Sequence, residues 1–197
     1  MTDITDDAAP IAAQRPYAGR FDQVSIALHW LTVLLIVGQF TTGWMAAEGT
    51  IGDPELAFLI HRSLGVVTWG VVALRLVWRY AFAALPPFPE SMGPIQQWAA
   101  KLNEYALYLL LVAQPMTGLA SLMYRGRPIV LFTWTMPTLV AKDREFGRTL
   151  FEVHEKTAWA LLALIGIHAV AGLLHAFVFR DGVMGRMLPW TRKSAET

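Results

Sequence analysis

Four apolar stretches, each about as long as a lipid bilayer is thick, constrain the fold more than any other feature of this sequence. They cover residues 26–47, 57–80, 98–124 and 154–179. A helix of about 20 mostly apolar residues spans the hydrocarbon core of a bilayer, and such a segment satisfies its own backbone hydrogen bonds only as a helix. The sequence therefore predicts an all-α membrane protein, a bundle of four transmembrane helices.

The composition supports this prediction and excludes several other classes of protein. Of the 197 residues, 55% are hydrophobic and 16% are charged, whereas about a quarter of a typical soluble domain is charged. The net charge of +1 indicates no nucleic-acid partner. Cysteine is absent, which excludes disulfides, iron–sulfur clusters, thiolate catalysis and thioether-linked haem. Any metal must therefore be held by His, Met or carboxylate ligands.

Residues 22–190 are predicted to form the four-helix domain, between a disordered N-terminal tail of residues 1–21 and a C-terminal tail of residues 191–197. The N-terminal tail is acidic where a signal peptide would be basic, so the first helix is predicted to be retained. A fifth apolar run, residues 129–140, is short enough for an interfacial or re-entrant segment. The membrane side of the N-terminus, here called the near side, carries slightly more Lys and Arg than the far side, which predicts a cytoplasmic N-terminus.

All five histidines lie in or at the edge of the predicted helices: His29, His61, His154, His168 and His175. Ionisable residues inside a membrane are rare and usually functional. His154 and His168 are 14 positions apart on the last helix, which is about 21 Å along the axis and within roughly 40° of one face. One helix therefore presents two histidines on one face, near opposite surfaces of the membrane.

The first two helices supply a partner at each of these two depths. Counted from the far ends of their helices, His29 and His61 also differ in level by about 21 Å. We therefore expect two pairs, His61 with His154 and His29 with His168. Opposed imidazoles from facing helices hold haem iron in bundle cores, whereas zinc takes three or four ligands, commonly including carboxylate or thiolate. The pairs favour two haem groups.

Three residues close to these histidines have the properties of haem contacts. Gly65 and Gly172 each follow a predicted ligand by four positions and share its helix face. A small residue there leaves room for a flat macrocycle, or it serves close helix packing. Arg75, in the near half of the second helix, suits a haem propionate, because Arg pairs with carboxylates; the alternative is that it reaches toward the lipid headgroups.

His175 lies about 10 Å nearer the near side than His168, and at that level it is predicted not to ligate a haem. It is a candidate for hydrogen bonding to a quinone or for relaying a proton, with contact to lipid headgroups or water as the alternative. Lys156 and Glu155 are the corresponding quinone or proton candidates beside the far-side pair. The side on which quinone binds is left open.

Several short motifs resemble those of the bacterial cytochrome b561 family. They lie at residues 25–30 (Ser-Ile-Ala-Leu-His-Trp), 60–65 (Ile-His-Arg-Ser-Leu-Gly), 125–128, 135–137, 154–155, 166–175 and 187–189. The resemblance implies a four-helix bundle in the bacterial inner membrane with two bis-histidine b haems, ligated by His29, His61, His154 and His168. It also implies electron exchange with quinone. Members of the family oxidise periplasmic superoxide with ubiquinone or serve as membrane subunits of dehydrogenases and hydrogenases.

Three functions are consistent with these features. The first is a superoxide:ubiquinone oxidoreductase with two b haems, and the second is a haem-carrying subunit between quinone and a docked soluble redox partner. The third is a His-dependent metal transporter without haem. Nothing in the sequence indicates an oligomeric state. Six basic residues on the far side are suited to steering an anion such as superoxide, or simply form a solvated loop: Arg125, Arg127, Lys142, Arg144, Arg148 and Lys156.

Overall fold

The computed structural model describes residues 19–49, 52–89, 92–137 and 139–189. Its long helices are α1 (Gln23–Glu48), α2 (Pro54–Ala81), α3 (Pro94–Tyr124) and α4 (Arg144–Leu174). All are long and apolar enough to cross a membrane, with α4 continued by the π-helical turn η1 (His175–Phe179). The predicted four-helix membrane fold is confirmed. The two predicted tails, 1–21 and 191–197, lie almost entirely outside the described residues.

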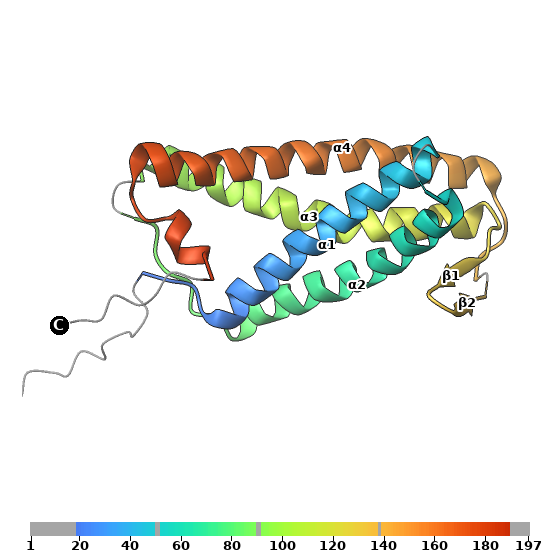
Figure 1. Ribbon diagram of the computed structural model, residues 1–197, viewed down its shortest axis with the longest axis horizontal. Helices are drawn as coiled ribbons and strands as arrows, with labels where there is room; N and C mark the ends of the chain where they lie inside the picture. The colour runs from blue at the N-terminus through green and yellow to red at the C-terminus, as the bar shows by residue number, and fades with distance from the viewer. Residues whose placement is uncertain (1–18, 50–51, 90–91, 138, 190–197) are drawn as a thin grey trace, which may run out of the picture.

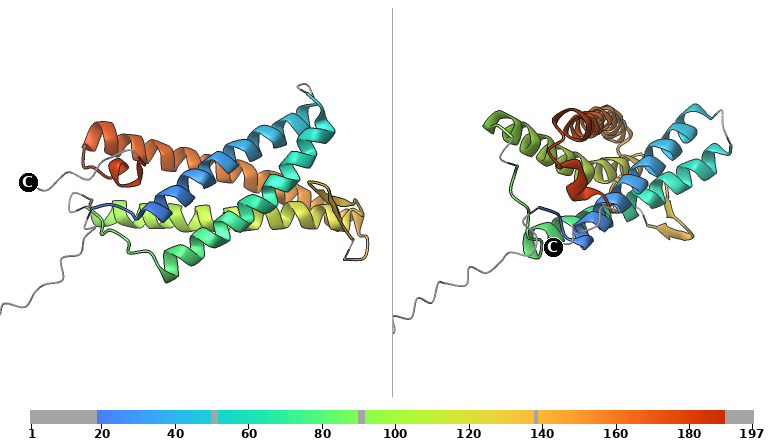
Figure 2. Two further views of the ribbon diagram at one scale, coloured as in Figure 1. Left: turned by 60° about the horizontal axis from the view of Figure 1, so that its bottom comes forward. Right: turned by 60° about the vertical axis from the view of Figure 1, so that its left-hand side comes forward.

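The helices form two antiparallel hairpins, α1 with α2 and α3 with α4, and α2 packs on α3 between them. The two hairpins cross at an angle, as Figure 1 and both views of Figure 2 show. The near end of the bundle holds the start of α1, the end of α4 and the short 3-10 helix η2 (Met184–Met187). The far end holds a small antiparallel sheet of β1 (Ile129–Leu131) and β2 (Trp134–Met136).

Large apolar side chains cover the outside of the bundle. Leu34 on α1 and Leu109 on α3 are each 69% exposed, and Val170 on α4 is 55% exposed. Such extensive apolar surface marks contact with lipid or with another protein, and on four helices of membrane-spanning length lipid is its natural solvent. The buried centre is small by comparison and consists of Val72, Leu111 and Leu161.

An aspartate begins three of the four long helices. The side chains of Asp22, Asp53 and Asp143 accept hydrogen bonds from backbone N–H groups in the first turns of α1, α2 and α4, which satisfies donors that a helix start leaves free. Helix α4 begins at Arg144, ten positions before the start of the predicted span at residue 154. Its first turns are polar and project beyond the apolar stretch, so hydropathy alone could not find them.

The short apolar run after α3, predicted as an interfacial or re-entrant segment, forms the β1–β2 hairpin. Ile129 and Leu131 of β1 are buried against Leu122 of α3. The backbone N–H of Phe132 donates to the Ser63 hydroxyl of α2 at 2.8 Å. The hairpin is thereby fixed to both helical hairpins and covers part of the far end of the bundle.

The residues before α1 are joined to the segment after α4 at the near end. Arg20 donates from its guanidinium to the carbonyl oxygen of Leu188 at 2.6 Å, and the N–H of Phe21 donates to the carbonyl oxygen of Arg186 at 3.3 Å. The indole N–H of Trp30 donates to the carbonyl oxygen of Met187 at 2.8 Å. These contacts hold η2 against the start of α1.

Candidate metal centres

Four of the five histidines face each other in two pairs between the helical hairpins. The ring centroids of His61 and His154 are 6.2 Å apart, and those of His29 and His168 are also 6.2 Å apart. Because a bond from a metal ion to an imidazole nitrogen is about 2 Å long, two imidazoles on opposite sides of one ion have centroids about 6 Å apart. Among the described residues, no group of three or more His, Asp or Glu is placed to hold a metal ion. Each pair thus offers two candidate ligands.

The far-side pair, His61 and His154, is held by main-chain carbonyl groups. The Nδ1 atom of His61 lies 3.0 Å from the carbonyl oxygen of Gln39, and that of His154 lies 3.0 Å from the carbonyl oxygen of Gln114. A carbonyl oxygen only accepts, so both Nδ1 atoms must carry the proton. Each Nε2 then keeps its lone pair for a metal ion, in the arrangement that metal-binding histidines usually have. The far-side residues therefore fit a haem iron.

Two glycines lie directly against these imidazoles. A Cβ atom at Gly43 of α1 would come within 3.0 Å of Cε1 of His61, and one at Gly118 of α3 would come within 3.0 Å of Cε1 of His154. A contact this short would displace the ring by a few tenths of an ångström. The close approach of helix and ring therefore favours glycine at both positions.

The near-side pair, His29 and His168, has a charged neighbour instead. The guanidinium of Arg75 lies 3.0 Å from Nδ1 of His29 and donates to its lone pair. Ligation of iron through Nε2 requires the other tautomer, with the proton on Nδ1, and in that state Arg75 is free to turn toward an anion such as a propionate. His168 is more exposed than the other three histidines. The near-side residues fit a haem with this change of tautomer.

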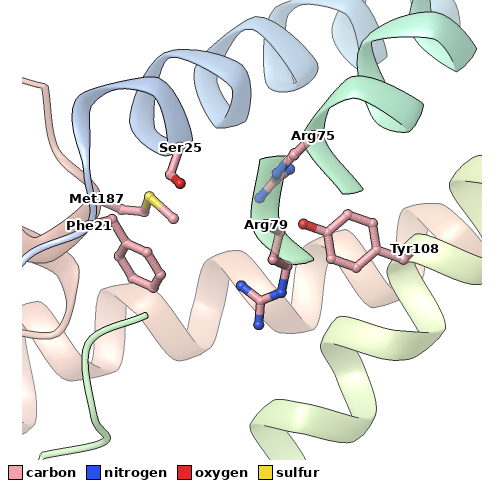
Figure 3. A pocket seen from close by; sticks show the side chains of 6 residues that line it. All are labelled: Phe21, Ser25, Arg75, Arg79, Tyr108 and Met187. Atoms are coloured by element: carbon pink, nitrogen blue, oxygen red, sulfur yellow. The ribbon is translucent and has the colours of Figure 1, made fainter. Parts of the chain in front are cut away.

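A small polar pocket lies beside Arg75 at the near end. Figure 3 shows Arg75 and Arg79 of α2 and the hydroxyl of Tyr108 of α3 pointing into it, with Ser25 of α1 at its edge. Arg79 forms an ion pair with Glu104 at 2.7 Å, so its charge is balanced. Arg75 is the guanidinium available here for the carboxylate of a bound group.

The structure places the two predicted glycine contacts next to side chains. A Cβ atom at Gly65 would lie 3.6 Å from the amide nitrogen of Gln39, which is an ordinary contact. One at Gly172 would lie 3.3 Å from Sδ of Met184, which is tight. The role of both glycines in making room for a macrocycle stays a prediction.

His175 has a buried partner that sequence reasoning did not find. Its Nδ1 atom lies 2.6 Å from Oδ2 of Asp181, and the two side chains are 13% and 8% exposed. Burial alone would raise the pKa of the Asp181 carboxyl, but the hydrogen bonds from His175 and from the N–H of Val183 outweigh it and lower that pKa. Glu155 and Lys156, the other two candidates, are exposed beside His154.

Basic side chains gather around a cavity of ≈ 420 Å³ at the far end. It is lined by Arg125, Gly126, Arg127, Lys142, Arg144 and Arg148. Partial burial and then the charge of Arg127 lower the pKa of the Arg125 guanidinium, as happens where like charges gather. Lys156, the sixth predicted basic residue, is not part of the lining.

Each far-side histidine is supported by a neighbouring helix, and this contact was not predicted from the sequence. Gln39, Thr42 and Gly43 surround the ring of His61, and an equivalent set on α3 surrounds that of His154. A signal for both was present, because the motif Gln-x-x-Thr-Gly occurs at residues 39–43 and again at residues 114–118. Asp181 carries no comparable signal, since its contact with His175 depends on the π-helical turn between them.

Four membrane-spanning helices with two pairs of opposed imidazoles between them are the architecture of a membrane b-type cytochrome. The sequence model of the family described as "Prokaryotic cytochrome b561" matches residues 20–190. The chain belongs to this family and is therefore a multi-pass bacterial membrane protein that binds b-type haem and transfers electrons. The His-dependent metal transporter is left without support.

Relatives in this family align over most of the chain. The protein named cytochrome b561 homolog 2 of Escherichia coli is 30% identical over 86% of this chain and 91% of its own length. The protein named probable superoxide oxidase CybB of Yersinia pestis is 27% identical over 88% of this chain and 98% of its own length. Cytochrome b561 homolog 1 of Escherichia coli is 28% identical over 86% of this chain and 97% of its own length.

Proposed function

We propose that the chain carries electrons across the bacterial inner membrane through two b haems, one ligated by His29 and His168 and the other by His61 and His154. The observation that carries this proposal is the ring-to-ring distance of 6.2 Å in both pairs. Bound haem supplies one-electron redox chemistry, which the protein tunes through ligation, hydrogen bonding and burial. Arg75 is proposed to hold a propionate, and Gly65 and Gly172 to leave room for the macrocycles.

If two histidines held each haem, the iron would have no coordination position left for a substrate, and the haem would supply one-electron transfer without binding the donor or the acceptor. Residues at the two ends of the bundle would then select the donor and the acceptor. The residues proposed for this selection line the far-side cavity and form the near-side segment after α4.

We propose superoxide as the donor on the far side, taken to be periplasmic, and ubiquinone as the acceptor. Two superoxide ions each lose one electron to become dioxygen, and one quinone gains two electrons and two protons to become quinol. The basic far-side cavity supports an anionic donor. The name of the Yersinia pestis relative points to the same donor.

The quinone is proposed to bind on the near side beside His175. Reduction of a quinone consumes protons, and His175 is the candidate whose imidazole is held by a buried carboxylate, that of Asp181. Glu155 and Lys156 are exposed on the far side. His175→Gln is therefore expected to slow quinol formation while leaving haem reduction by superoxide unchanged, whereas Lys156→Gln is expected to leave quinol formation unchanged.

The ligand assignment is tested by the haem content of the purified protein. Two haems per chain are expected for the wild type and one for either His154→Ala or His168→Ala. The matched control is His175→Gln, which is expected to keep both. One haem in the wild type, or loss of haem in the control, would contradict the assignment.

The donor is tested by mixing the oxidised protein with superoxide in a stopped-flow instrument. Rapid haem reduction followed by quinol formation is expected. The second candidate function is a membrane subunit that receives electrons from a docked soluble protein, and the same basic surface favours an acidic partner of this kind. Absence of rapid reduction by superoxide would favour this second candidate.

A further inference from the structure

The far-side site is built twice from one motif. Gln-x-x-Thr-Gly lies at residues 39–43 of α1 and at residues 114–118 of α3. In each copy the main-chain carbonyl oxygen of the Gln accepts a hydrogen bond from Nδ1 of a histidine on the following helix, at 3.0 Å in both. The Gln amide donates back to the carbonyl of that histidine, at 3.0 Å and 3.1 Å. The Thr hydroxyl lies 3.5 Å and 3.3 Å from the same Nδ1.

Each helical hairpin therefore contributes one half of the far-side site, and the halves are equivalent. The motif glycine completes the match, because a Cβ at either one would meet Cε1 of its histidine at 3.0 Å. Both far-side imidazoles are thus held in the same tautomer, in which the Nδ1–H group donates a hydrogen bond to a neutral main-chain carbonyl oxygen.

The near-side site breaks this repeat. Positions in the two hairpins are equivalent when they lie equally far along the helix from the motif glutamine or from the far-side histidine. At the near side these equivalent positions carry different residues: Arg75 in α2 corresponds to His168 in α4, and His29 in α1 corresponds to Glu104 in α3. One near-side histidine thus comes from each hairpin, and the two remaining equivalent positions are charged. Glu104 is engaged by Arg79 at 2.7 Å, while the guanidinium of Arg75 lies 3.0 Å from the His29 ring.

These two environments act in opposite directions on a bound metal ion. A carbonyl that accepts from Nδ1 makes the imidazole a stronger donor through Nε2, which favours the ferric state. The guanidinium of Arg75, whether beside His29 or turned toward a propionate, adds positive charge near the haem and so favours the ferrous state, which carries one positive charge less. Hydrogen bonding and local charge are the means by which a protein sets the potential of a haem.

We propose that this broken repeat makes the far-side haem the weaker oxidant and the near-side haem the stronger one, so that electrons pass from the far side to the near side. Gln39 and Gln114 are positioning residues that lower the far-side potential, and Arg75 raises the near-side potential. The proposal rests on the ligation of two haems proposed above and adds a direction to it.

Redox titration of the purified protein with both haems bound tests this order. The single-haem variants His168→Ala and His154→Ala identify which titration wave belongs to which site. The near-side haem is expected to titrate at the higher potential. Arg75→Gln is expected to shift its equilibrium about tenfold toward the oxidised form, which is 59 mV for one electron, and Arg75→Lys is expected to keep most of the wild-type value.

The matched control is the double variant Arg79→Gln/Glu104→Gln, which removes the adjacent ion pair without changing the net charge and is expected to shift the near-side equilibrium less than twofold. Coincident potentials, a reversed order or an unchanged potential in Arg75→Gln would overturn the proposal. A wild-type haem content below two per chain would instead overturn the ligand assignment on which it rests.

The two glutamines are tested in the same titration. Gln39→Met and Gln114→Met keep the size of the side chain but remove the amide that fixes the backbone of each far-side histidine. Each is expected to raise the far-side potential and to leave the near-side potential unchanged. A role in packing alone would lower the melting temperature without moving either potential, and that result would overturn the assignment of the glutamines.

Discussion

At the scale of single residues, the four paired histidines differ in what holds their second nitrogen atom. The levels of these histidines follow from counting residues along straight helices, and the structure has the counted partners face to face. The groups that orient them could not be counted in this way. The acceptors for His61 and His154 are main-chain carbonyls, and because every residue has a carbonyl, only the repeated Gln-x-x-Thr-Gly motif marks the two that are used.

The glycines beneath the far-side rings give the first prediction. Gly43→Ala and Gly118→Ala each place a Cβ within 3.0 Å of an imidazole carbon, so the ring must move and haem is expected to be lost from the far-side site alone. The haem content should fall from two per chain to about one. Gly70→Ala on α2 and Gly166→Ala on α4, where nothing lies within 4 Å of the new Cβ, should keep both haems.

The carboxylate that holds His175 gives a pH-dependent prediction. The pKa of Asp181 lies below its ordinary value of 3.8, because hydrogen bonds outweigh the effect of burial. A carboxylate whose pKa is lowered by folding stabilises the folded state above its unfolded pKa, and this contribution disappears as the pH falls through the folded pKa. Asp181→Asn is therefore expected to lower the melting temperature by a few degrees at pH 7.

Once the pH has fallen through the folded pKa of Asp181, which lies below 3.8, the melting temperatures of the wild type and of Asp181→Asn should converge, since the wild-type carboxyl is then also neutral. Thermal unfolding followed at several pH values measures this. A difference that stays equally large from pH 7 down to the lowest pH at which the protein remains folded would show that the carboxylate charge is not what holds the segment after α4.

At the scale of whole elements, hydropathy predicts the four helices but not where they begin. The polar first turns of α4, from Arg144 onward, carry no membrane signal, although Asp143 is a readable helix start. The apolar run from Ile129 was too short for a span, and its two paired strands pack on Leu122 and Ser63. Tertiary contact of this kind is not encoded in a local pattern.

The cap of α4 gives a prediction at this scale. Asp143→Ala removes the side chain that accepts from the N–H of Phe146 at 2.9 Å, and loss of such a cap costs about 1 kcal/mol. Denaturation in detergent should show a destabilisation of this size. Asp143→Asn, which caps a helix about as well, should retain the wild-type stability. Equal stability of the alanine and asparagine variants would contradict a capping role.

At the scale of the whole molecule, charge is distributed unevenly although the net charge is only +1. Basic side chains converge on the cavity at the far end, from the end of α3 and the start of α4. A concave basic surface raises the encounter rate of an anion, and salt screens this effect. The far end of the bundle is therefore the one suited to receive a small anionic donor.

Haem reduction by superoxide should accordingly slow down as salt is added. We expect about a tenfold fall in the second-order rate constant between about 0.01 M and 0.15 M ionic strength. In Arg127→Gln/Arg144→Gln, which removes two charges from the cavity lining, the rate at low salt should be lower and its salt dependence flatter. Reduction by an uncharged donor serves as the control and should respond to neither change.

Because of the contacts between the residues before α1 and those after α4, the two helical hairpins could follow each other in the opposite order along the chain. Because Phe21 and Arg186 are hydrogen bonded, residues 19 and 189 can be joined by a short linker, and a circularly permuted chain can begin at residue 92 and end at residue 89. In that chain the hairpin of α3 and α4 is synthesised first. It should still insert, fold and bind two haems, since each site is defined by which helix faces meet and not by which hairpin is translated first.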